Sequence, residues 1–396
     1  MRPNILFIHS NGIVPTAGGI SRTTANLVAL FREKGHSVWM MGVRNKHPQA
    51  IYDKQQSFLP EGSRADAPEN LSFMKQFLRS NDIEIVVNQT PFATDIVQLL
   101  AHCKAKCGVK VVSCYHNSIL TPVYNYAYQQ ELRLRQRHLS GLFWLLKQKL
   151  MNDLLVKAYI AKYRKAFLKT STHSDAIVLL CDGQVEEWKR MTGMSEPNNV
   201  SVIPNYMPSI ADEGENHKKN HVLWVGTFDY NVKRPDLILQ IWQRVWKKHQ
   251  DWHLFMLGDG PSLNLMKQQV LNQKIGNVTF TGRVTPTDYY KSAKIQCVTS
   301  VHEAFPMVII EGMQSNIPVI SFESFTSSSL IINNTENGFL IHPFNIDSYT
   351  STLEKLMEDE ELRSSMGKKA KASVGRFSPC TVYSLWQQLF EKLWNH

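Results

Sequence analysis

The chain has 396 residues, more than the roughly 250–300 residues over which one hydrophobic core grows, so we expect two domains. Hydrophobic residues make up 43% and charged residues 20%, which excludes a disordered chain. Six cysteines exclude a disulfide scaffold and favour a reducing cytoplasm, and no apolar run approaches the roughly 20 residues of a membrane-spanning helix. Residues 1–9 lack the apolar core and cleavage site of a secretory signal, so no such signal is expected.

The formal net charge of +10 lies entirely in the first half of the chain. Residues 1–210 carry 25 Lys and Arg against 15 Asp and Glu, whereas residues 211–396 carry 19 of each. Within the first half, residues 131–170 carry ten basic side chains against only Glu131 and Asp153. Such asymmetry suggests an anionic partner, and a solvated helix face is the alternative.

Buried-strand and helical patterns alternate in the first half. A strand at 4–9 is followed by a glycine-bearing loop at 10–19, a helix from 20 to about 34 and a strand at 38–41. Further strands are expected at 83–87, 109–114, 176–180 and 200–203, with a long helical tract over about 127–170. The order of strand, glycine loop, helix and strand predicts a parallel sheet.

The pattern restarts after a polar linker at 206–220. Strands are expected at 221–226, 253–258, 278–282, 295–298 and 318–321, with a helix at 235–248. The fold class is therefore α/β, with two doubly wound Rossmann-like domains, 1–205 and 221–378, facing a cleft. Ligands of such sheets bind beyond the carboxyl ends of the strands. No complete G-x-G-x-x-G fingerprint occurs, which disfavours a nicotinamide enzyme.

The stretch 302–313 holds two carboxylates, one on a loop and one on the helix that follows. Glu303 lies in the loop, Pro306 in the first helical turn and Glu311 about two turns later. Free backbone N–H groups at a helix start can bind phosphate, and carboxylates at this spacing could hold hydroxyls at both ends of a nucleotide sugar. The alternative is an acidic residue near a helix start and an ordinary helix glutamate, and spacing alone leaves both open.

The spacing from Glu303 to Glu311 resembles the E-x7-E pattern of the retaining glycosyltransferases of family 4, which have the GT-B fold. The resemblance covers nearly the whole chain, in the family's order of motifs. The similar segments are residues 16–20, 34–38, 111–117, 202–205, 224–226 followed by Lys233, 256–261, 278–284, 317–320 and 337–341. Each segment alone is a weak signal, but their shared order is specific.

The resemblance implies a donor site for a nucleotide-diphosphate sugar in the second domain. Glu311 would hold the ribose hydroxyls, and Glu303 would hold hydroxyls of the transferred sugar. Lys233 would neutralise charge developing on the diphosphate, which can be the largest catalytic contribution in a water-poor site. The other donor-binding residues that it implies are Gly226, Thr227, Gly258, Arg283 and Val284 near the base, and the helix start formed by Phe305, Pro306, Met307 and Val308.

In the first domain the resemblance implies three site residues. Gly18 and Gly19 would let the backbone approach the diphosphate closely. His116 would contact the sugar at the reaction centre and is the third expected catalytic residue, with Glu303 and Lys233. A histidine after a strand is by itself more often structural, so this role rests on the resemblance.

Thr227 departs from the family pattern, which usually has arginine at this position. A neutral hydroxyl cannot replace a guanidinium group on phosphate. We therefore expect Arg234, the neighbour of Lys233, to supply the second positive charge, with a weakened donor site as the alternative. The chain contains no Asp-x-Asp motif, so side-chain and helix charges are expected to replace a metal, and no metal or cofactor is expected.

Residues 133–169 interleave basic and apolar side chains. Apolar residues recur there near helical spacing, at Leu139, Phe143, Leu146, Leu150 and Leu154. Such a segment either binds an anionic membrane surface or is a helical insertion on the first domain with a solvated basic face. Nucleic-acid binding is not expected, because no recognised motif accompanies the charge. Residues 379–396 are expected to form a helix, and the resemblance to the GT-B fold implies that this helix crosses back to the first domain.

The resemblance to family 4 implies a retaining hexosyltransferase, and the missing Asp-x-Asp motif favours a metal-independent one. Together with the basic first half, the resemblance suggests a role in surface polysaccharide synthesis, such as lipopolysaccharide or capsule synthesis. The enzyme's expected partners are a nucleotide sugar, a glycan or glycolipid acceptor and an anionic membrane surface. Its expected location is the cytoplasm, peripheral at the inner face of the cytoplasmic membrane. The alternatives are another GT-B reaction, such as sugar-nucleotide epimerisation, or a non-catalytic glycan- or membrane-binding protein with a decayed donor site.

Overall fold

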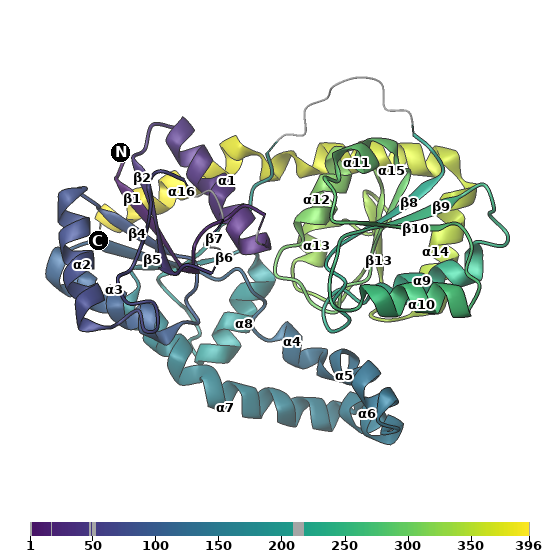
Figure 1. Cartoon of the computed structure of the whole chain (residues 1–396), viewed down its shortest axis with the longest axis horizontal. Coiled ribbons are helices and arrows are strands. Elements are labelled where there is room, and N and C mark those ends of the chain that lie inside the picture. Colours follow the sequence, from purple (N-terminus) through teal and green to yellow (C-terminus); the bar gives the residue numbers. More distant parts are fainter. Residues whose placement is uncertain (1, 17, 47–48, 50–52, 209–217, 396) are drawn as a thin grey trace. The chain divides into compact units, whose positions relative to one another are not determined.

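The computed structural model describes residues 2–16, 18–46, 49, 53–208 and 218–395, and the chain divides into two compact units (Figure 1). The first unit comprises residues 1–117, 158–208 and 377–396, and the second comprises residues 118–157 and 209–376. Residues 209–217 of the expected linker, and Ala17 of the glycine loop, lie outside the described residues.

The first unit contains a seven-stranded parallel sheet in the order β3-β2-β1-β4-β5-β6-β7. Its strands are β1 (Ile5–Asn11), β2 (Val38–Arg44), β3 (Gln56–Phe58), β4 (Ile85–Asn88), β5 (Lys110–Cys114), β6 (Ala176–Leu179) and β7 (Val200–Val202). Its helices are α1 (Gly19–Glu33), α2 (Pro68–Ser80), α3 (Thr94–Cys107), α8 (Asp182–Thr192), α16 (Pro379–Trp394) and most of α7 (Lys149–His173). The continuous apolar runs of the central strands reflect burial on both faces, which is typical of parallel sheets.

Successive residues of β1 enter two separate hydrophobic cores. Ile5 and Phe7 pack with α1 and α16 on one face of the sheet, and Leu6 and Ile8 pack with α2 and α3 on the other. Figure 1 shows α1 in purple beside α16 in yellow. The last helix of the chain therefore completes a core that begins with its first strand.

The second unit contains a six-stranded parallel sheet in the order β10-β9-β8-β11-β12-β13. Its strands are β8 (His221–Val225), β9 (His253–Leu257), β10 (Val278–Gly282), β11 (Ile295–Val298), β12 (Val319–Phe322) and β13 (Gly338–Ile341). Around it lie the helices α9 (Pro235–Val245), α10 (Leu263–Asn272), α11 (Thr287–Ser292), α12 (Met307–Gln314), α13 (Ser328–Ile331), α14 (Ile346–Glu358), α15 (Glu360–Ser373) and the 3-10 turn η1 (Val374–Phe377).

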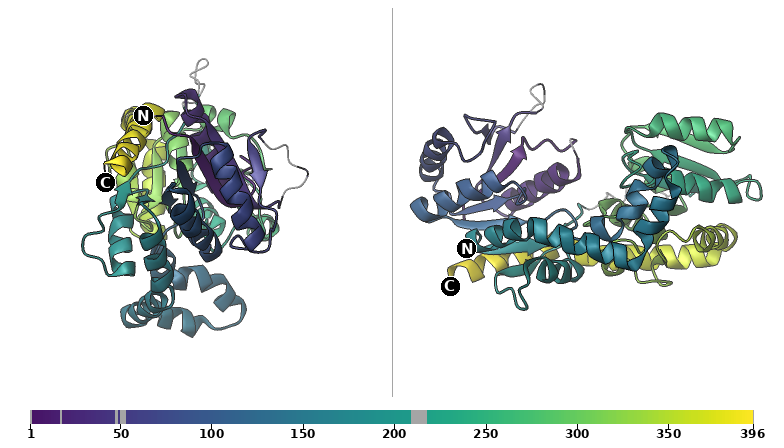
Figure 2. Two further views of the ribbon diagram at one scale, coloured as in Figure 1. Left: turned by 90° about the vertical axis from the view of Figure 1, so that its left-hand side faces the viewer. Right: turned by 90° about the horizontal axis from the view of Figure 1, so that it is seen from below.

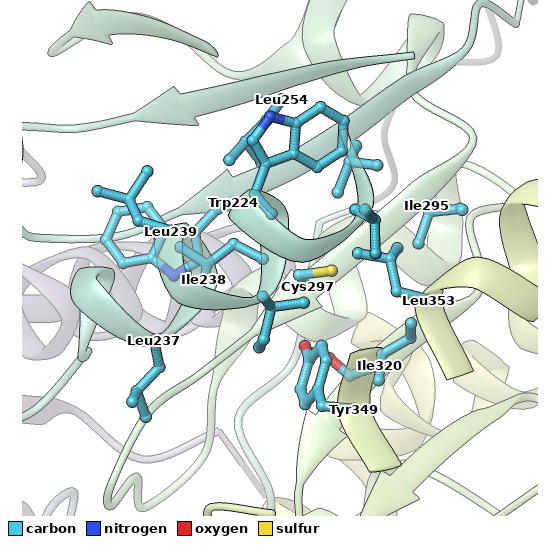
Figure 3. Packing of buried hydrophobic residues seen from close by; sticks show 14 of the residues in the cluster. Trp224, Leu237, Ile238, Leu239, Leu254, Ile295, Cys297, Ile320, Tyr349 and Leu353 are labelled. Carbon is cyan, nitrogen blue, oxygen red and sulfur yellow. The ribbon is translucent and has the colours of Figure 1, made fainter. Parts of the chain in front are cut away.

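The core of the second unit joins the sheet to the helices α9 and α14. Trp224 of β8 packs there with Ile238 of α9 and Leu254 of β9, and Tyr349 and Leu353 of α14 complete the cluster (Figure 3). The period of the buried residues of α9 is helical, and Pro235 occupies its first turn, where a missing N–H costs nothing. This packing holds the carboxyl end of β8, where the candidate site begins.

Three further helices belong to the second unit: α4 (Thr121–Tyr124), α5 (Tyr126–Gln136) and α6 (Ser140–Lys147). Helix α7 begins in the second unit and continues in the first. The right-hand view of Figure 2 shows α7 as one uninterrupted helix in teal. The sequence prediction assigned all of 127–170 to the first domain, whereas the structure groups residues 118–157 with the second unit. The side chains responsible for this difference are described below. No helix of the described ranges combines the length and apolar character needed to cross a membrane.

Candidate active site

Each sheet has a switch point, at which the order of the strands in the sheet reverses. The first sheet grows outward from β1 to one side and continues from β4 on the other, and the second does the same at β8 and β11. Loops after the two central strands diverge at such a point, so ligands of doubly wound sheets bind beyond its carboxyl edge. The predicted site residues are therefore expected after β1 and β4 in the first unit and after β8 and β11 in the second.

Lys233 and Glu303 meet at the switch point of the second sheet. Lys233 follows β8, Glu303 follows β11, and their side chains form an ion pair that is only partly exposed to solvent. Ser300 Oγ donates a hydrogen bond of 2.8 Å to Glu303 Oε1. Two of the three predicted catalytic residues are thus in contact. Ser300, which also bonds to the Glu303 carboxylate, was not predicted from the sequence.

Thr299 fixes the loop that carries Lys233. Its hydroxyl lies 2.9 Å from the carbonyl oxygens of both Lys233 and Arg234, and Trp224 Nε1 donates to the same hydroxyl over 3.0 Å. Val301 N donates to the Val232 carbonyl over 2.7 Å. Since Thr299 is buried, these bonds tie the β8 and β11 loops together rigidly. A threonine at the end of a strand carries no sequence signal for this role.

Glu311 lies buried on α12 and accepts a hydrogen bond of 2.7 Å from the hydroxyl of Tyr290 on α11. Helix α12 begins at Met307, so Pro306 is its N-cap residue and not a member of its first turn as predicted. Phe305 lies just before this cap, and Val308 accepts a bond from Gln296 through its carbonyl. The predicted helix start is therefore present beside Glu303, one residue later than expected.

Glycines after β8 and β9 bring two loops into close contact. A Cβ atom at Gly258, whose φ is +133°, would lie 1.9 Å from the carbonyl oxygen of Gly226. Only glycine tolerates both this backbone conformation and this approach. The structure therefore gives Gly226 and Gly258 a packing role at the carboxyl edge of the sheet, next to the exposed Thr227.

Arg234 does not occupy the position that the sequence led us to expect. Its guanidinium group is buried and donates to both carboxylate oxygens of Asp236 over 2.9 Å, to Glu131 over 3.0 Å and to the Tyr128 carbonyl over 3.1 Å. Burial alone would lower the pKa of Arg234, but the adjacent carboxylates outweigh it and raise the pKa. Its charge is already neutralised within the fold, so the prediction that it supplies the second charge to phosphate is wrong.

The same contacts explain why residues 118–157 group with the second unit. Glu131 of α5 pairs with Arg234, and the ring of Tyr128 lies 3.8 Å from that of Phe344. Asn125 donates to the carbonyls of Val301 and Ser324 over 2.7 and 2.8 Å. A further bond of 2.6 Å joins Ser118 Oγ to the carbonyl of Glu303. The helical segment thus buttresses the loop that carries Glu303.

Arg283 and Val284 follow β10 and are exposed. Strand β10 is the edge strand of the second sheet, so both residues lie at its carboxyl edge, two strands from β8. Both side chains are accessible, as the predicted contact with the nucleotide base requires, but no described contact indicates which base they would bind.

In the first unit, His116 lies after β5 beside Gln89, which follows β4. Nε2 of His116 and Oε1 of Gln89 are in close contact, whereas His116 Nδ1 and Gln89 Nε2 have no partner among the described residues. Burial, with His9 nearby, lowers the pKa of His116 to about 4, so the imidazole is neutral at pH 7. Unpaired buried polar atoms are costly and mark a place where a ligand can bond. Thr23, Thr24 and Tyr206 line a small cavity of about 20 Å³ with them.

Gly18 and Gly19 stand at the start of α1, after β1. Gly18 is the N-cap residue with φ of +147°, a conformation that favours glycine. No described atom lies within 4 Å of a Cβ built at either position, so the backbone there is approachable. The three predicted residues of the first unit therefore share the carboxyl edge of its sheet.

Comparison with known proteins identifies the family to which the chain belongs. The family described as Glycosyltransferase Family 4 matches residues 17–207, and Glycosyl transferases group 1 matches residues 208–373. The chain belongs to the group 1, family 4 glycosyltransferases, and its two Rossmann-like units have the folds of GT-B enzymes.

Among curated relatives, an uncharacterised glycosyltransferase of Haemophilus influenzae is 28% identical over 205 residues, covering 50% of this chain and 56% of that protein. The amylovoran biosynthesis glycosyltransferase AmsD of Erwinia amylovora is 27% identical over 210 residues, covering 50% and 58%. The chain thus spans little more than half the length of these relatives.

Solved structures resemble the chain over nearly its full length. The lipopolysaccharide outer core galactosyltransferase WaaB aligns with a TM-score of 0.68 at 18% identity, covering 98% of this chain and 99% of WaaB. Anabaena Alr3699/HepE in complex with UDP aligns with a TM-score of 0.73 at 14% identity, covering 99% and 100%. At these identities the likeness establishes the fold.

Proposed function

We propose that the protein is a retaining hexosyltransferase that moves a sugar from a nucleotide-diphosphate sugar to an acceptor hydroxyl. The observation that carries the proposal is the contact of Lys233 with Glu303 at the switch point of the second sheet. Glu311, buried on the adjacent helix α12, supplies the second carboxylate. The position of Glu303 before α12 and of Glu311 on it supports the assignment of the E-x7-E pair to the donor site.

The ion pair suggests how the site responds to a donor. Without ligand, the charges of Lys233 and Glu303 neutralise each other. An incoming diphosphate draws the ammonium group toward its oxygens, which leaves the Glu303 carboxylate to accept hydrogen bonds from the sugar hydroxyls. In the reaction the bond from the anomeric carbon to the diphosphate oxygen breaks, a bond to the acceptor oxygen forms, and the proton of the acceptor hydroxyl passes to the departing diphosphate. Lys233 then stabilises the charge on the departing diphosphate.

We also propose that this reaction needs no metal. Support comes from the position of Lys233 and of the α12 start, whose backbone N–H groups can receive phosphate oxygens as a metal ion otherwise would. Activity that is unchanged by a chelator supports this assignment. Activity that a chelator abolishes and magnesium or manganese restores contradicts it.

The acceptor in this proposal is a growing surface glycan or glycolipid, such as lipopolysaccharide or capsule. The names of AmsD and WaaB describe such reactions for those proteins, and the excess positive charge of residues 1–210 suits an anionic acceptor or surface. The corresponding location is the cytoplasm, at the inner face of the cytoplasmic membrane, with residues 133–169 as the contact.

A panel of nucleotide sugars tests the function. Purified protein is incubated with each donor and with acceptor oligosaccharides, and the free nucleoside diphosphate is measured, with the impaired variant Glu303→Gln as the low-activity control. We expect release with one donor, and NMR of the product should show the anomeric configuration of that donor. A changed sugar without nucleotide release would identify an epimerase. Donor binding without turnover would identify a non-catalytic protein.

A further inference from the structure

A cavity of about 430 Å³ lies at the amino edge of the second sheet. Lys218 precedes β8, Lys294 precedes β11 and Asn316 precedes β12, and all three residues line the cavity. The strands of this sheet are parallel, so the cavity lies at the opposite edge from Lys233 and Glu303, which follow β8 and β11. Its volume is typical of a pocket for a small molecule.

Helix α15 forms one wall of the cavity, because a glycine lets it lie against the loop before β12. A Cβ atom at Gly367 would lie 2.2 Å from the carbonyl oxygen of Asn316. Around this contact, α15 contributes Arg363, Ser364 and Lys368 to the lining. The wall is therefore fixed by close packing of a helix against the sheet loops.

The lining of the cavity is positively charged. Among the described residues that line it, one is acidic, Glu360, and four are basic: Lys218, Lys294, Arg363 and Lys368. The Glu360 side chain is exposed, and its carboxylate lies 3.9 Å from both Lys294 and Arg363. An exposed carboxylate at this distance contributes little, so the cavity keeps a positive field that attracts an anion.

The lysine side chains of the cavity retain hydrogen-bond donors for a ligand. Lys218 Nζ donates to the carbonyls of Tyr290 and Ser315 over 3.1 and 2.7 Å, and Lys294 Nζ donates to Asn220 Oδ1 over 2.9 Å. An ammonium group has three N–H donors, so these bonds leave at least one on each lysine. Burial, with the charge of Lys371 nearby, lowers the pKa of Lys218 to about 8. An anion in the cavity would supply the counter-charge that carbonyl dipoles lack.

Arg363 is held in place before any ligand binds. Its side chain is 7% exposed, and its guanidinium group lies 5.2 Å from the ring centre of Trp252. Nη1 donates to the carbonyls of Leu356 and Met357 over 2.6 and 3.0 Å. Nη2 lies 3.9 Å from the Glu360 carboxylate, too far for a hydrogen bond. A guanidinium group fixed in this way loses little freedom when it binds an anion.

We propose that this cavity is a binding site for a small anion that carries a phosphate or diphosphate group. Lys218, Lys294 and Lys368 bind the phosphate oxygens, and Asn316 and Ser364 offer hydrogen bonds to the rest of the molecule. The volume suits a molecule of the size of a sugar phosphate or a nucleoside diphosphate. The site is separate from the donor site proposed above and does not depend on that function.

Isothermal titration calorimetry with pyrophosphate tests the proposal. The starting protein is Lys233→Ala/Glu311→Gln, so that the candidate donor site is impaired. We expect saturable binding that weakens as salt is added. Addition of Lys368→Glu should weaken this binding at least about tenfold. The matched control is Lys369→Glu, because Lys369 is the next residue of α15, is equally exposed and does not line the cavity, and it should change the affinity less than about twofold.

Two further titrations distinguish the sources of the phosphate group. Uridine diphosphate and glucose 1-phosphate are titrated into the same starting protein, and the tighter ligand identifies a nucleotide or a sugar phosphate as the occupant. Absence of pyrophosphate binding, or an equal effect of Lys368→Glu and Lys369→Glu, overturns the proposal. Because the starting protein lacks residues assigned to the donor site, this test and the nucleotide-sugar panel succeed or fail independently.

Discussion

Lys233 and Arg234 are neighbours in sequence with opposite surroundings. Lys233 reaches Glu303 at the edge of the sheet, whereas Arg234, with φ of +49°, turns into the protein toward Asp236 and Glu131. The sequence analysis predicted both residues as ligands of the diphosphate. The backbone turn between strand β8 and helix α9 sends only the first of them toward the site.

Their alanine variants should therefore fail in different ways. Lys233→Ala should lower kcat/KM at least about tenfold, which corresponds to about 1.4 kcal/mol, with little effect on folding. Arg234→Ala leaves the buried carboxylate of Asp236 without its guanidinium partner and should lower the free energy of unfolding by about 3 kcal/mol or more. Urea denaturation measures this loss, with Arg244→Ala as the control, because Arg244 makes an exposed ion pair worth less than about 1 kcal/mol. An Arg234→Ala protein of normal stability but raised donor KM would restore the phosphate-binding role.

The two glutamates should separate binding from turnover. Glu311→Gln should raise the donor KM about tenfold, because Glu311 is expected to hold the ribose equally in ground and transition states. Glu303→Gln should lower kcat about a hundredfold, because sugar positioning contributes to the transition state. Steady-state kinetics with the correct donor measures both, and Glu336→Gln on the exposed surface is the control. Wild-type kinetics in both variants would remove them from the site.

His116 should make stability depend on pH. The unfolded chain protonates this imidazole near pH 6.5, but the folded protein does so only at about 4, because burial favours the neutral form. The unfolded state therefore binds more protons in this window, so the stabilisation is complete above about pH 6.5 and is lost as the pH falls toward about 4. Urea unfolding at several pH values should show this fall, and His116→Gln should reduce it. Parallel curves for the two proteins would contradict the assignment.

Helix α12 is positioned by the absence of one side chain. A Cβ atom at Gly312 would lie 1.8 Å from Oε1 of Gln296 on β11, and the amide of the same glutamine donates 2.9 Å to the Val308 carbonyl. Glycine at this position lets the helix lie against the sheet. Since Glu311 is the preceding residue, the packing of the whole helix also positions the carboxylate.

Gly312→Ala should consequently reduce activity at least about tenfold and lower stability, although alanine is favoured over glycine within helices by about 1 kcal/mol. The matched control is Gly141→Ala in α6, where no described atom lies within 4 Å of the added carbon. That variant should be fully active and no less stable. If both variants behaved alike, close packing of α12 would not determine the site geometry.

At the scale of the whole chain, the first unit depends on its last helix. Phe31 of α1 lies 5.7 Å from Trp386 and 5.6 Å from Phe390, measured between ring centres, and His36 Nε2 lies 3.0 Å from the hydroxyl of Tyr383. The core that contains β1 is therefore complete only when α16, which follows the second unit in the chain, has packed against α1.

Trp386→Ala should lower the free energy of unfolding of the first unit by about 3–5 kcal/mol, as expected for a large aromatic residue removed from a core. Gln388→Ala, on the exposed side of the same helix, should change it by less than about 0.5 kcal/mol. Hydrogen exchange of peptides from β1 and α1 locates the effect in the first unit. Similar protection in the two variants would mean that α16 is dispensable for this core.

The sequence by itself determined the architecture of the two sheets. The central strands are buried on both faces, so their residues are apolar in an almost unbroken run that can be recognised in the sequence. These runs are residues 5–8, 85–88 and 295–298. The order of glycine loops, strands and the Glu303–Glu311 spacing is equally local, so it identified the family and the carboxyl edges at which site residues lie.

Only the tertiary structure decided which charged side chains are available to a ligand. Glu131 adds a second carboxylate to the Arg234–Asp236 pair from a position 103 residues earlier, and Tyr290 reaches Glu311 from another helix. Long-range contacts of this kind also explain why residues 118–157 belong to the second unit and not, as predicted, to the first. Such pairings depend on which distant loops come together in the fold. A local pattern of apolar and polar residues contains no information about these contacts.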